Sequence, residues 1–138
     1  MKFYKGRLID HVHVRSSDFE ASKRFYKAVL GALEIPILGE SETHLAADEL
    51  WLDQASNSAP PTGRMHLAFQ ASDREAVQRF HRAAIEAGGC DNGPPGERAY
   101  HPGYFAAYVL DPDCNNIEAV THGRVVRSAA AIEETFEG

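Results

Sequence analysis

The chain repeats one stretch of its own sequence at a spacing of 55 residues, measured from His11 to His66. Without a gap, residues 8–26 align with residues 63–81, and the identical pairs are His11 and His66, Ser17-Asp18 and Ser72-Asp73, Glu20-Ala21 and Glu75-Ala76, and Arg24-Phe25 and Arg79-Phe80. A repeat of this length indicates two copies of one supersecondary unit that pack against each other. Each copy also places a histidine at the same point of a strand pattern.

The beginning of each copy predicts a strand followed by a helix. The first residues alternate, so that His11 and His13 share the face opposite the apolar residues, and His66 does the same in the second copy. Ser17–Glu20 and Ser72–Glu75 then have the pattern of a capping box, in which a hydroxyl accepts from a helix amide and a glutamate reaches back. We therefore expect a helix after each strand.

About three further strands are expected after each helix. The predicted ranges are 33–38, 43–46 and 49–53 in the first copy, and 104–110 and 116–121 in the second. Residues 91–103 are rich in glycine and proline, which predicts a long loop of the kind that often closes over a site. Each copy is therefore expected to run strand, helix and then strands.

These patterns predict an α+β fold of two βαβββ repeats, whose curved mixed sheets surround a concave metal or ligand site with the helices outside. We expect a single domain over residues 1–138. Its parts are repeat one at about 7–54, a linker at 55–63, repeat two at about 64–122 and a C-terminal helix at about 125–137. The last helix is predicted from apolar residues at helical spacing, namely Val125, Ala129, Ile132 and Phe136.

Composition argues against several classes of protein. The 14 basic and 20 acidic residues give a formal charge of −6, which disfavours a nucleic-acid surface. The first residues lack the apolar segment of a signal peptide, and no apolar run is long enough to span a bilayer. We therefore expect a cytoplasmic protein with a small-molecule substrate, with no nucleic-acid or membrane partner, and with Cys90 and Cys114 as free thiols.

Three side chains are predicted to meet on the concave face. In the last strand the alternation places Glu118 opposite the apolar residues, on the side that we expect His11 and His66 to share. Two imidazoles and one carboxylate from three strands can bind a divalent metal and leave positions open for water or substrate oxygens. A simpler interpretation stays open at this point, in which the histidines only form hydrogen bonds and Glu118 pairs with Arg64 or Arg98.

The chain resembles the vicinal oxygen chelate superfamily, which includes glyoxalase I, the bleomycin-resistance proteins, the fosfomycin-resistance thiol transferases and the extradiol dioxygenases. The resemblance extends over residues 7–122 and is carried by Ile9-Asp10-His11-Val12 with Ser17-Asp18 and Phe25-Tyr26, by His66-Leu67-Ala68-Phe69, and by Asp111-Pro112-Asp113 with Asn116-Ile117-Glu118. It implies paired βαβββ units, a homodimer, and His11, His66 and Glu118 as ligands of a divalent metal ion such as Zn, Ni, Mn, Fe or Mg.

Two features depart from the family pattern. Glyoxalase I has a fourth ligand, a carboxylate in the fourth strand of the first copy. In this chain, alignment of the two copies places the residue equivalent to Glu118 near Leu52, which is not a carboxylate. Asp53 would serve only if the strand slipped by one residue, which would exchange its faces. Cys114 follows the Asp-Pro-Asp turn where the family usually has glycine. This indicates either that the turn does not need a positive φ or that it tolerates strain.

Two further residues are candidates for catalysis. Tyr104 could donate a hydrogen bond to an oxyanion, and His101 could act as a general base if its loop folds over the metal. Core packing for Tyr104 and simple surface exposure for His101 are the alternatives, and His13 could support the metal ligands from behind.

The sequence therefore predicts a metal-dependent enzyme of lyase or isomerase type, which acts on a small substrate with adjacent oxygens and uses the metal as a Lewis acid. Three alternatives stay open. They are a metal-free drug-binding protein similar to the bleomycin-resistance proteins, a thiol transferase, and a relative of the extradiol dioxygenases. Metal dependence separates the first alternative from an enzyme, and consumption of a thiol identifies the second.

Overall fold

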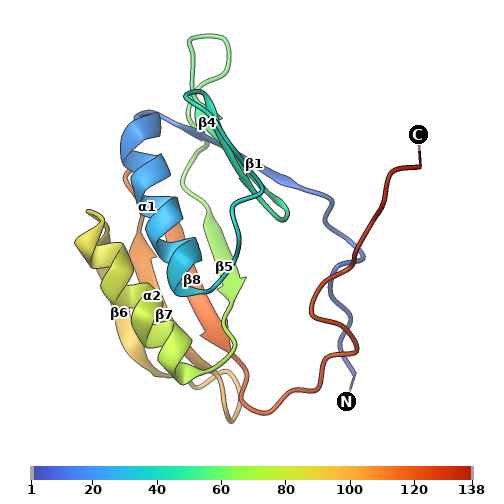
Figure 1. The fold of residues 1–138 in the computed structure, drawn as a ribbon. Coiled ribbons are helices and arrows are strands. Elements are labelled where there is room, and N and C mark those ends of the chain that lie inside the picture. Colours follow the sequence, from blue (N-terminus) through green and yellow to red (C-terminus); the bar gives the residue numbers. More distant parts are fainter. Residues whose placement is uncertain (1, 138) are drawn as a thin grey trace.

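The computed structural model describes residues 2–137, and within them the chain forms two helices and eight strands (Figure 1). The strands are β1 (Val12–Ser16), β2 (Gly39–Glu40), β3 (His44–Ala47), β4 (Leu50–Gln54), β5 (His66–Gln70), β6 (Cys90–Glu97), β7 (Phe105–Leu110) and β8 (Asn116–Thr121). The helices are α1 (Phe19–Ala32) and α2 (Arg74–Glu86). Met1 and Gly138, the ends of the expected domain, lie outside the described residues.

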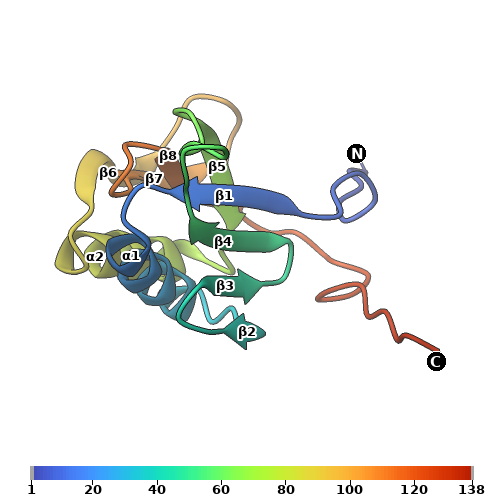
Figure 2. The ribbon, with the colours of Figure 1, turned by 90° about the horizontal axis from the view of Figure 1, so that it is seen from above.

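The strands form two sheets with the same topology. Sheet one has the order β1-β4-β3-β2, and sheet two has the order β5-β8-β7-β6. In each sheet the first pair of strands is parallel and the other pairs are antiparallel. Figure 2 shows the ladder of sheet one from β1 to β2. The unit of strand, helix and three strands thus occurs twice, which confirms the predicted α+β fold of two βαβββ repeats.

Both helices begin at an aspartate that caps their first turn. Asp18 accepts a hydrogen bond from the amide three residues later at 3.1 Å, and Asp73 does the same at 2.7 Å. The N-cap therefore lies one residue after the serine that each capping-box pattern predicted. Neither of these helices, the two that the described chain forms, is long and apolar enough to cross a membrane.

The two helices pack against each other and against one face of each sheet (Figure 1). Their buried stripes join the inward-facing strand residues in one hydrophobic core. Because side chains alternate along a strand, the opposite face of each sheet carries a different set of residues. We call these surfaces open face one, which includes His13, His44, Trp51 and Asp53, and open face two, which includes His66, Ala68, Tyr108 and Glu118.

The turn between β7 and β8 ties the second repeat to the first. Asp111 is only 4% exposed, and its carboxylate accepts the hydroxyl of Tyr26 from α1 at 2.7 Å. The same carboxylate accepts three N–H groups from within the turn. Asp113 accepts hydrogen bonds from the amide and the hydroxyl of Ser17. The Asp-Pro-Asp stretch therefore has a structural task, because it joins the two repeats.

Two stretches differ from their predicted structure. Residues 33–38, expected as a strand, form none, and the first edge strand is limited to Gly39–Glu40. Pro36 has no amide to contribute to a ladder. Residues 90–97, expected in a long loop, form the edge strand β6, where shifts of register accommodate the glycines and prolines. The loop before β7 is therefore limited to residues 98–104.

The C-terminal helix predicted at about 125–137 is absent, since residues 122–137 contain no helix or strand. The apolar residues expected to pack are exposed, among them Val125 at 58%, Ile132 at 65% and Phe136 at 97%. A short helix is marginal in water unless its apolar face is covered, and the body of the domain does not cover it here. Figures 1 and 2 show this tail and the N-terminal segment on the side away from the helices.

Both cysteines are free thiols, as predicted, and both are exposed. Cys114 has a φ of +63°, so the turn does adopt a left-handed conformation without a glycine. A side chain in this conformation is strained by contact between its Cβ and the backbone. Of the two interpretations of the missing glycine, tolerated strain is therefore the correct one.

Candidate metal and substrate site

Strands β5 and β8 bring two of the three predicted metal ligands together on open face two. His66 begins β5, and Glu118 lies in the parallel strand β8. His66 Nε2 is 2.9 Å from Glu118 Oε2, and the carboxylate side chain is 2% exposed whereas the imidazole is 50% exposed. In the described part of the chain, Glu118 forms an ion pair with neither of the arginines considered as alternatives.

The hydrogen bonds of His66 direct its free ring nitrogen at a carboxylate. Its Nδ1 lies 3.0 Å from the carbonyl oxygen of Asn116, which can only accept, so Nδ1 carries a proton. In a neutral imidazole Nε2 then presents a lone pair to Glu118, which is also an acceptor. The contact is favourable only with a cation between the two atoms, either a proton or a metal ion. Metal-binding histidines commonly donate their second N–H to a carbonyl, so the arrangement fits a metal ligand.

Tyr104 holds the other oxygen of the Glu118 carboxylate. Its hydroxyl donates to Oε1 at 2.5 Å. Burial, followed by the hydrogen bond and charge of Glu118, raises the pKa of Tyr104 above its ordinary value of 10.0. The phenol is therefore a protonated donor at neutral pH. In this structure its acceptor is the carboxylate, so the tyrosine positions Glu118.

His101, predicted as a general base, lies in the loop before β7 and is exposed. Its Nδ1 is 2.9 Å from the carbonyl oxygen of the next residue, and its Nε2 is 2.9 Å from Nδ1 of His122. Both rings meet the ring of Tyr104 edge-on, at centroid distances of 5.4 and 5.1 Å. Burial, followed by the positive charge of Lys5, lowers the pKa of His122. His101 is therefore linked to Glu118 only through Tyr104 in the described structure.

Open face one carries a different polar group. His13 Nε2 lies 2.9 Å from Asp53 Oδ1, which is within the distance of an ion pair. The contact does not have the geometry of a hydrogen bond, and this buried nitrogen has no other hydrogen-bond partner within the described residues. Trp51 donates weakly to the same carboxylate at 3.4 Å and stacks on His44 with a centroid distance of 4.6 Å. An imidazole and a carboxylate thus also meet here, beside an aromatic pair.

The register of β1 and β4 corrects the prediction for Asp53. His13 is the partner of Trp51, and Ala68 is the partner of Glu118. His13 and Ala68 are equivalent in the 55-residue repeat. The residue of the first repeat that is equivalent to Glu118 is therefore Trp51, one residue earlier than the predicted Leu52. Asp53 therefore faces the same side as His13 without any slip of the strand.

His11, the third predicted ligand, precedes β1 and is not joined to the other two. Its side chain is 66% exposed, and Nδ1 lies 2.5 Å from Asp10 Oδ1. Among residues 2–137, no three side chains of His, Cys, Asp or Glu gather closely enough to hold a metal ion. One chain therefore brings together His66 and Glu118 alone.

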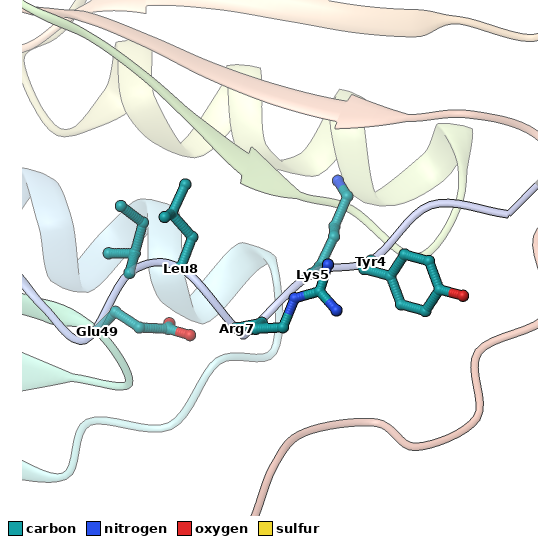
Figure 3. Close-up of a pocket in the computed structure, with 7 residues that line it drawn as sticks. Tyr4, Lys5, Arg7, Leu8 and Glu49 are labelled. Atoms are coloured by element: carbon teal, nitrogen blue, oxygen red, sulfur yellow. The ribbon is translucent and has the colours of Figure 1, made fainter.

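Two surface hollows lie on the first repeat and the N-terminal segment. One has a volume of about 460 Å³ and is lined by residues 4–9 together with Glu49 (Figure 3). The other has a volume of about 340 Å³ and contains His11 and His13 at the end of open face one. The second hollow places these two histidines at one surface.

Two residues beside the His66–Glu118 pair were not among the predicted site residues. The ring of Tyr108 is half-buried on open face two, with its centroid 6.0 Å from that of His66. The guanidinium carbon of Arg98 lies 5.3 Å from the centroid of Tyr108. Alternation along β7 gave a signal for Tyr108, because it shares a face with Tyr104. The sequence suggested Arg98 only as an ion-pair partner of Glu118, and no pattern placed it beside Tyr108.

Comparison with known proteins decides the family. The model of the Glyoxalase/Bleomycin resistance protein/Dioxygenase superfamily matches residues 8–119. A glyoxalase/bleomycin resistance protein from Albidiferax ferrireducens T118 has a similar structure, with a TM-score of 0.68, 33% identity, and coverage of 82% of this chain and 97% of that chain. The chain belongs to the glyoxalase/bleomycin resistance protein/dioxygenase superfamily.

More distant structures share the fold of this superfamily. A glyoxalase-related enzyme from Fulvimarina pelagi is 20% identical, with a TM-score of 0.65 and coverage of 89% of this chain and 99% of that chain. Lactoylglutathione lyase from Agrobacterium tumefaciens is 20% identical, with a TM-score of 0.55 and coverage of 85% and 95%. At this identity the likeness concerns the fold alone. No curated protein matches the sequence.

Proposed function

We propose that this member of the superfamily is a metal-dependent enzyme of lyase or isomerase type, which acts on a small substrate with two adjacent oxygens. The observation that carries the proposal is the pairing of His66 and Glu118. A ring nitrogen and a carboxylate oxygen face each other at 2.9 Å, while a backbone carbonyl holds the proton of the other ring nitrogen. A carboxylate that is 2% exposed also needs a nearby cation to offset its desolvation.

A divalent ion held by His66 and Glu118 would act as a Lewis acid on substrate oxygens in its open positions. The protein fixes both ligands in advance. The hydroxyl of Tyr104 binds Oε1 of the carboxylate and leaves Oε2 directed toward His66. The carbonyl of Asn116 sets the ring orientation of His66 in the same way. One nitrogen and one oxygen ligand are compatible with Zn, Ni, Mn, Fe or Mg.

We further propose that a second copy of the chain supplies the missing ligand, so that the active protein is a homodimer. Catalytic metal sites usually have three protein ligands, and one chain joins two here. The His11 side chain is 66% exposed and contacts the neighbouring Asp10. It is therefore accessible to another subunit, and we assign it as the third ligand.

Elemental analysis tests the metal site directly, on protein purified without a metal-affinity step. We expect about one divalent ion per chain in the wild type and in His44→Ala, a control histidine on open face one. His66→Ala and Glu118→Ala should lose the ion while circular dichroism shows the same fold. Wild-type protein that binds none of the five metals after their addition would contradict the proposal.

Mixing two inactive variants tests the shared site. If His11 comes from the opposite subunit, a dimer of one His11→Ala chain and one Glu118→Ala chain contains one intact site and one doubly defective site. Random reassociation should therefore restore about a quarter of the wild-type metal sites. If all ligands came from one chain, mixing would restore none.

The rival function, a metal-free drug-binding protein, has one observation in its favour. Trp51 is 38% exposed and stacks on His44 beside the hollow of open face one, which would suit a planar ligand. In that case bleomycin should raise the melting temperature of the wild type and of Glu118→Ala, but not of Trp51→Ala. The metal-dependent function requires no such shift.

A further inference from the structure

Arg98 carries a positive charge that no acidic side chain neutralises in the described structure. It directly follows β6, and within residues 2–137 no carboxylate oxygen lies within the ion-pair distance of 4.0 Å. Its Nη2 donates to the carbonyl oxygen of Pro94 at 2.7 Å, and its Nη1 donates to that of Glu97 at 3.2 Å. These carbonyls fix the guanidinium and leave other N–H groups available, since arginine has five.

The backbone of β6 makes room for this side chain. A Cβ atom at Gly96 would lie 2.9 Å from Nη1 of Arg98. A Cβ atom at Gly93 would lie 2.8 Å from the ring of Tyr108 and 3.4 Å from Nη2 of Arg98. Glycine at position 93, where φ is +151°, lets the ring of Tyr108 lie against the strand. The end of the Arg98 side chain occupies the space beside Gly96.

One aromatic ring, that of Tyr108, connects the guanidinium to the proposed metal ligands. Its carbon is 5.3 Å from the centroid of the Tyr108 ring, close enough for a cation–π contact. Tyr108 is the direct cross-strand partner of Glu118, and its ring centroid is 6.0 Å from that of His66. Arg98 and His66 are thus both neighbours of the Tyr108 ring, so a small molecule that binds at His66 and Glu118 and extends over this ring would reach Arg98.

We infer that Arg98 determines substrate specificity by binding a negatively charged oxyanion group of the substrate, a carboxylate or a phosphate, in addition to the two oxygens that the metal binds. This inference rests on the proposed function, because it places the oxyanion on the same small molecule as the chelating oxygens. Arginine suits such a group, since its planar fork donates two parallel hydrogen bonds. In a chain with a formal charge of −6, an unneutralised cation beside the site favours an anionic substrate.

Two chelators that differ by one carboxylate test the inference. Acetohydroxamic acid and succinohydroxamic acid present the same metal-binding oxygens, and only the second carries a carboxylate. Isothermal titration of nickel-loaded protein should show tighter binding of succinohydroxamic acid to the wild type. The preference should fall about tenfold in Arg98→Gln, with the affinity for acetohydroxamic acid unchanged.

The matched control is Arg82→Gln, which removes the same charge from an exposed position on α2. It should keep the preference for succinohydroxamic acid. Arg98→Lys should recover part of it, because a lysine keeps the charge without the fork. A preference that survives in Arg98→Gln would overturn the inference. Equal weakening of both chelators would also overturn it, because it would show that Arg98 only supports the packing of Tyr108.

The failure of the metal site and the failure of this inference are distinguishable. If no metal binds, inorganic phosphate is titrated into the metal-free protein instead. Phosphate binding that is present in the wild type and in Arg82→Gln but lost in Arg98→Gln supports the oxyanion site although the proposed function has failed. No phosphate binding, or equal binding by all three proteins, refutes the site.

Discussion

Open face one and open face two occupy the same place in their repeats, yet their chemistry differs. The second has Glu118 where the first has Trp51, and the first has His13 where the second has Ala68. The second therefore pairs a half-exposed imidazole with a buried carboxylate, while the first has the His13–Asp53 contact beside the stacked rings of His44 and Trp51. One fold thus supports two different surfaces in a single chain.

Apart from the histidine pair His11 and His66, the clearest positions that the repeats share are ones that hold the fold. Asp18 and Asp73 cap their helices in the same way, and Phe25 and Phe80 are both fully buried in the common core. Core residues are constrained by close packing, whereas a side chain on an open face is free to change without leaving a cavity. The comparison teaches that a duplicated scaffold can keep its packing while the side chains on its two open faces diverge.

A second difference lies in the turns that precede the last strand of each repeat. In the first repeat only Asp48 and Glu49 separate β3 from β4, whereas residues 111–115 separate β7 from β8. The longer turn buries Asp111 against Tyr26 of the first repeat. The second repeat therefore supplies a buried polar contact between the repeats that the short turn of the first repeat does not make.

Replacement of Asp111 should break this asymmetry most strongly. The Asp111 carboxylate accepts hydrogen bonds from N–H and O–H donors, and Asp111→Asn would turn an NH₂ group toward some of these donors. We therefore expect a loss of about 3 kcal/mol in the free energy of unfolding. Asp48→Asn, at the first residue of the short turn, should change it by less than about 0.5 kcal/mol. Urea unfolding of the three proteins measures both effects, and similar losses for the two variants would show that the turns are equivalent.

The helix caps should show where the repeats are alike. Asp18→Ala and Asp73→Ala each remove one hydrogen bond to an amide of the first turn, which should cost about 1 kcal/mol in either repeat. Thermal unfolding of the single and double variants measures the two costs. A cost confined to one helix would mean that the scaffold is not shared as closely as the structure indicates.

Cys114 offers a smaller test of the longer turn. Glycine relieves the strain at a φ of +63° but has more freedom in the unfolded chain, so Cys114→Gly should stabilise the protein by somewhat less than about 1 kcal/mol. Asp48, with a φ of +43°, should gain less from the same change, because aspartate tolerates this conformation better. Melting temperatures compare the two variants, and no gain for Cys114→Gly would indicate that the turn is not strained.

The buried contact between Tyr26 and Asp111 should make the stability of the protein depend on pH in the alkaline range. Burial, followed by the charge of Asp111, raises the pKa of Tyr26 well above 10.0. The folded protein then keeps a proton that the unfolded chain releases, so the contribution of Tyr26 is full below pH 10.0 and declines as the pH rises above it. The stability difference between wild type and Tyr26→Phe should therefore shrink above that pH. A constant difference in urea unfolding would contradict the raised pKa.

Much of the fold could be predicted because its signals are local. Alternating strands, helix stripes and the repeat itself indicated both βαβββ units, and the alternation in β8 put Glu118 on the face of His66. The edge strand β6 was missed because glycine and proline usually end a strand, whereas bulges accommodate them at a sheet edge. The C-terminal helix failed because periodicity does not reveal whether a surface exists to cover it.

Features of the site that depend on the pairing of strands, or on contacts between distant residues, could not be predicted. The side that Asp53 faces follows from the register of β1 with β4, and a repeat measured on β1 and α1 does not fix that register. The position of Arg98 depends on backbone carbonyls and on the space left by Gly93 and Gly96, none of which has a periodic signal. Sequence patterns give the faces of strands, and the contacts between strands come from the structure.

The central claim is that the metal binds at the His66–Glu118 pair of open face two, and not at the His13–Asp53 pair of open face one. Anomalous diffraction from crystals grown with saturating manganese tests it most directly, because the metal alone marks its position. We expect one peak at about 2.1 Å from His66 Nε2 and from the Glu118 carboxylate. A peak on His13 and Asp53 of open face one, or no peak at saturating metal, would contradict the account.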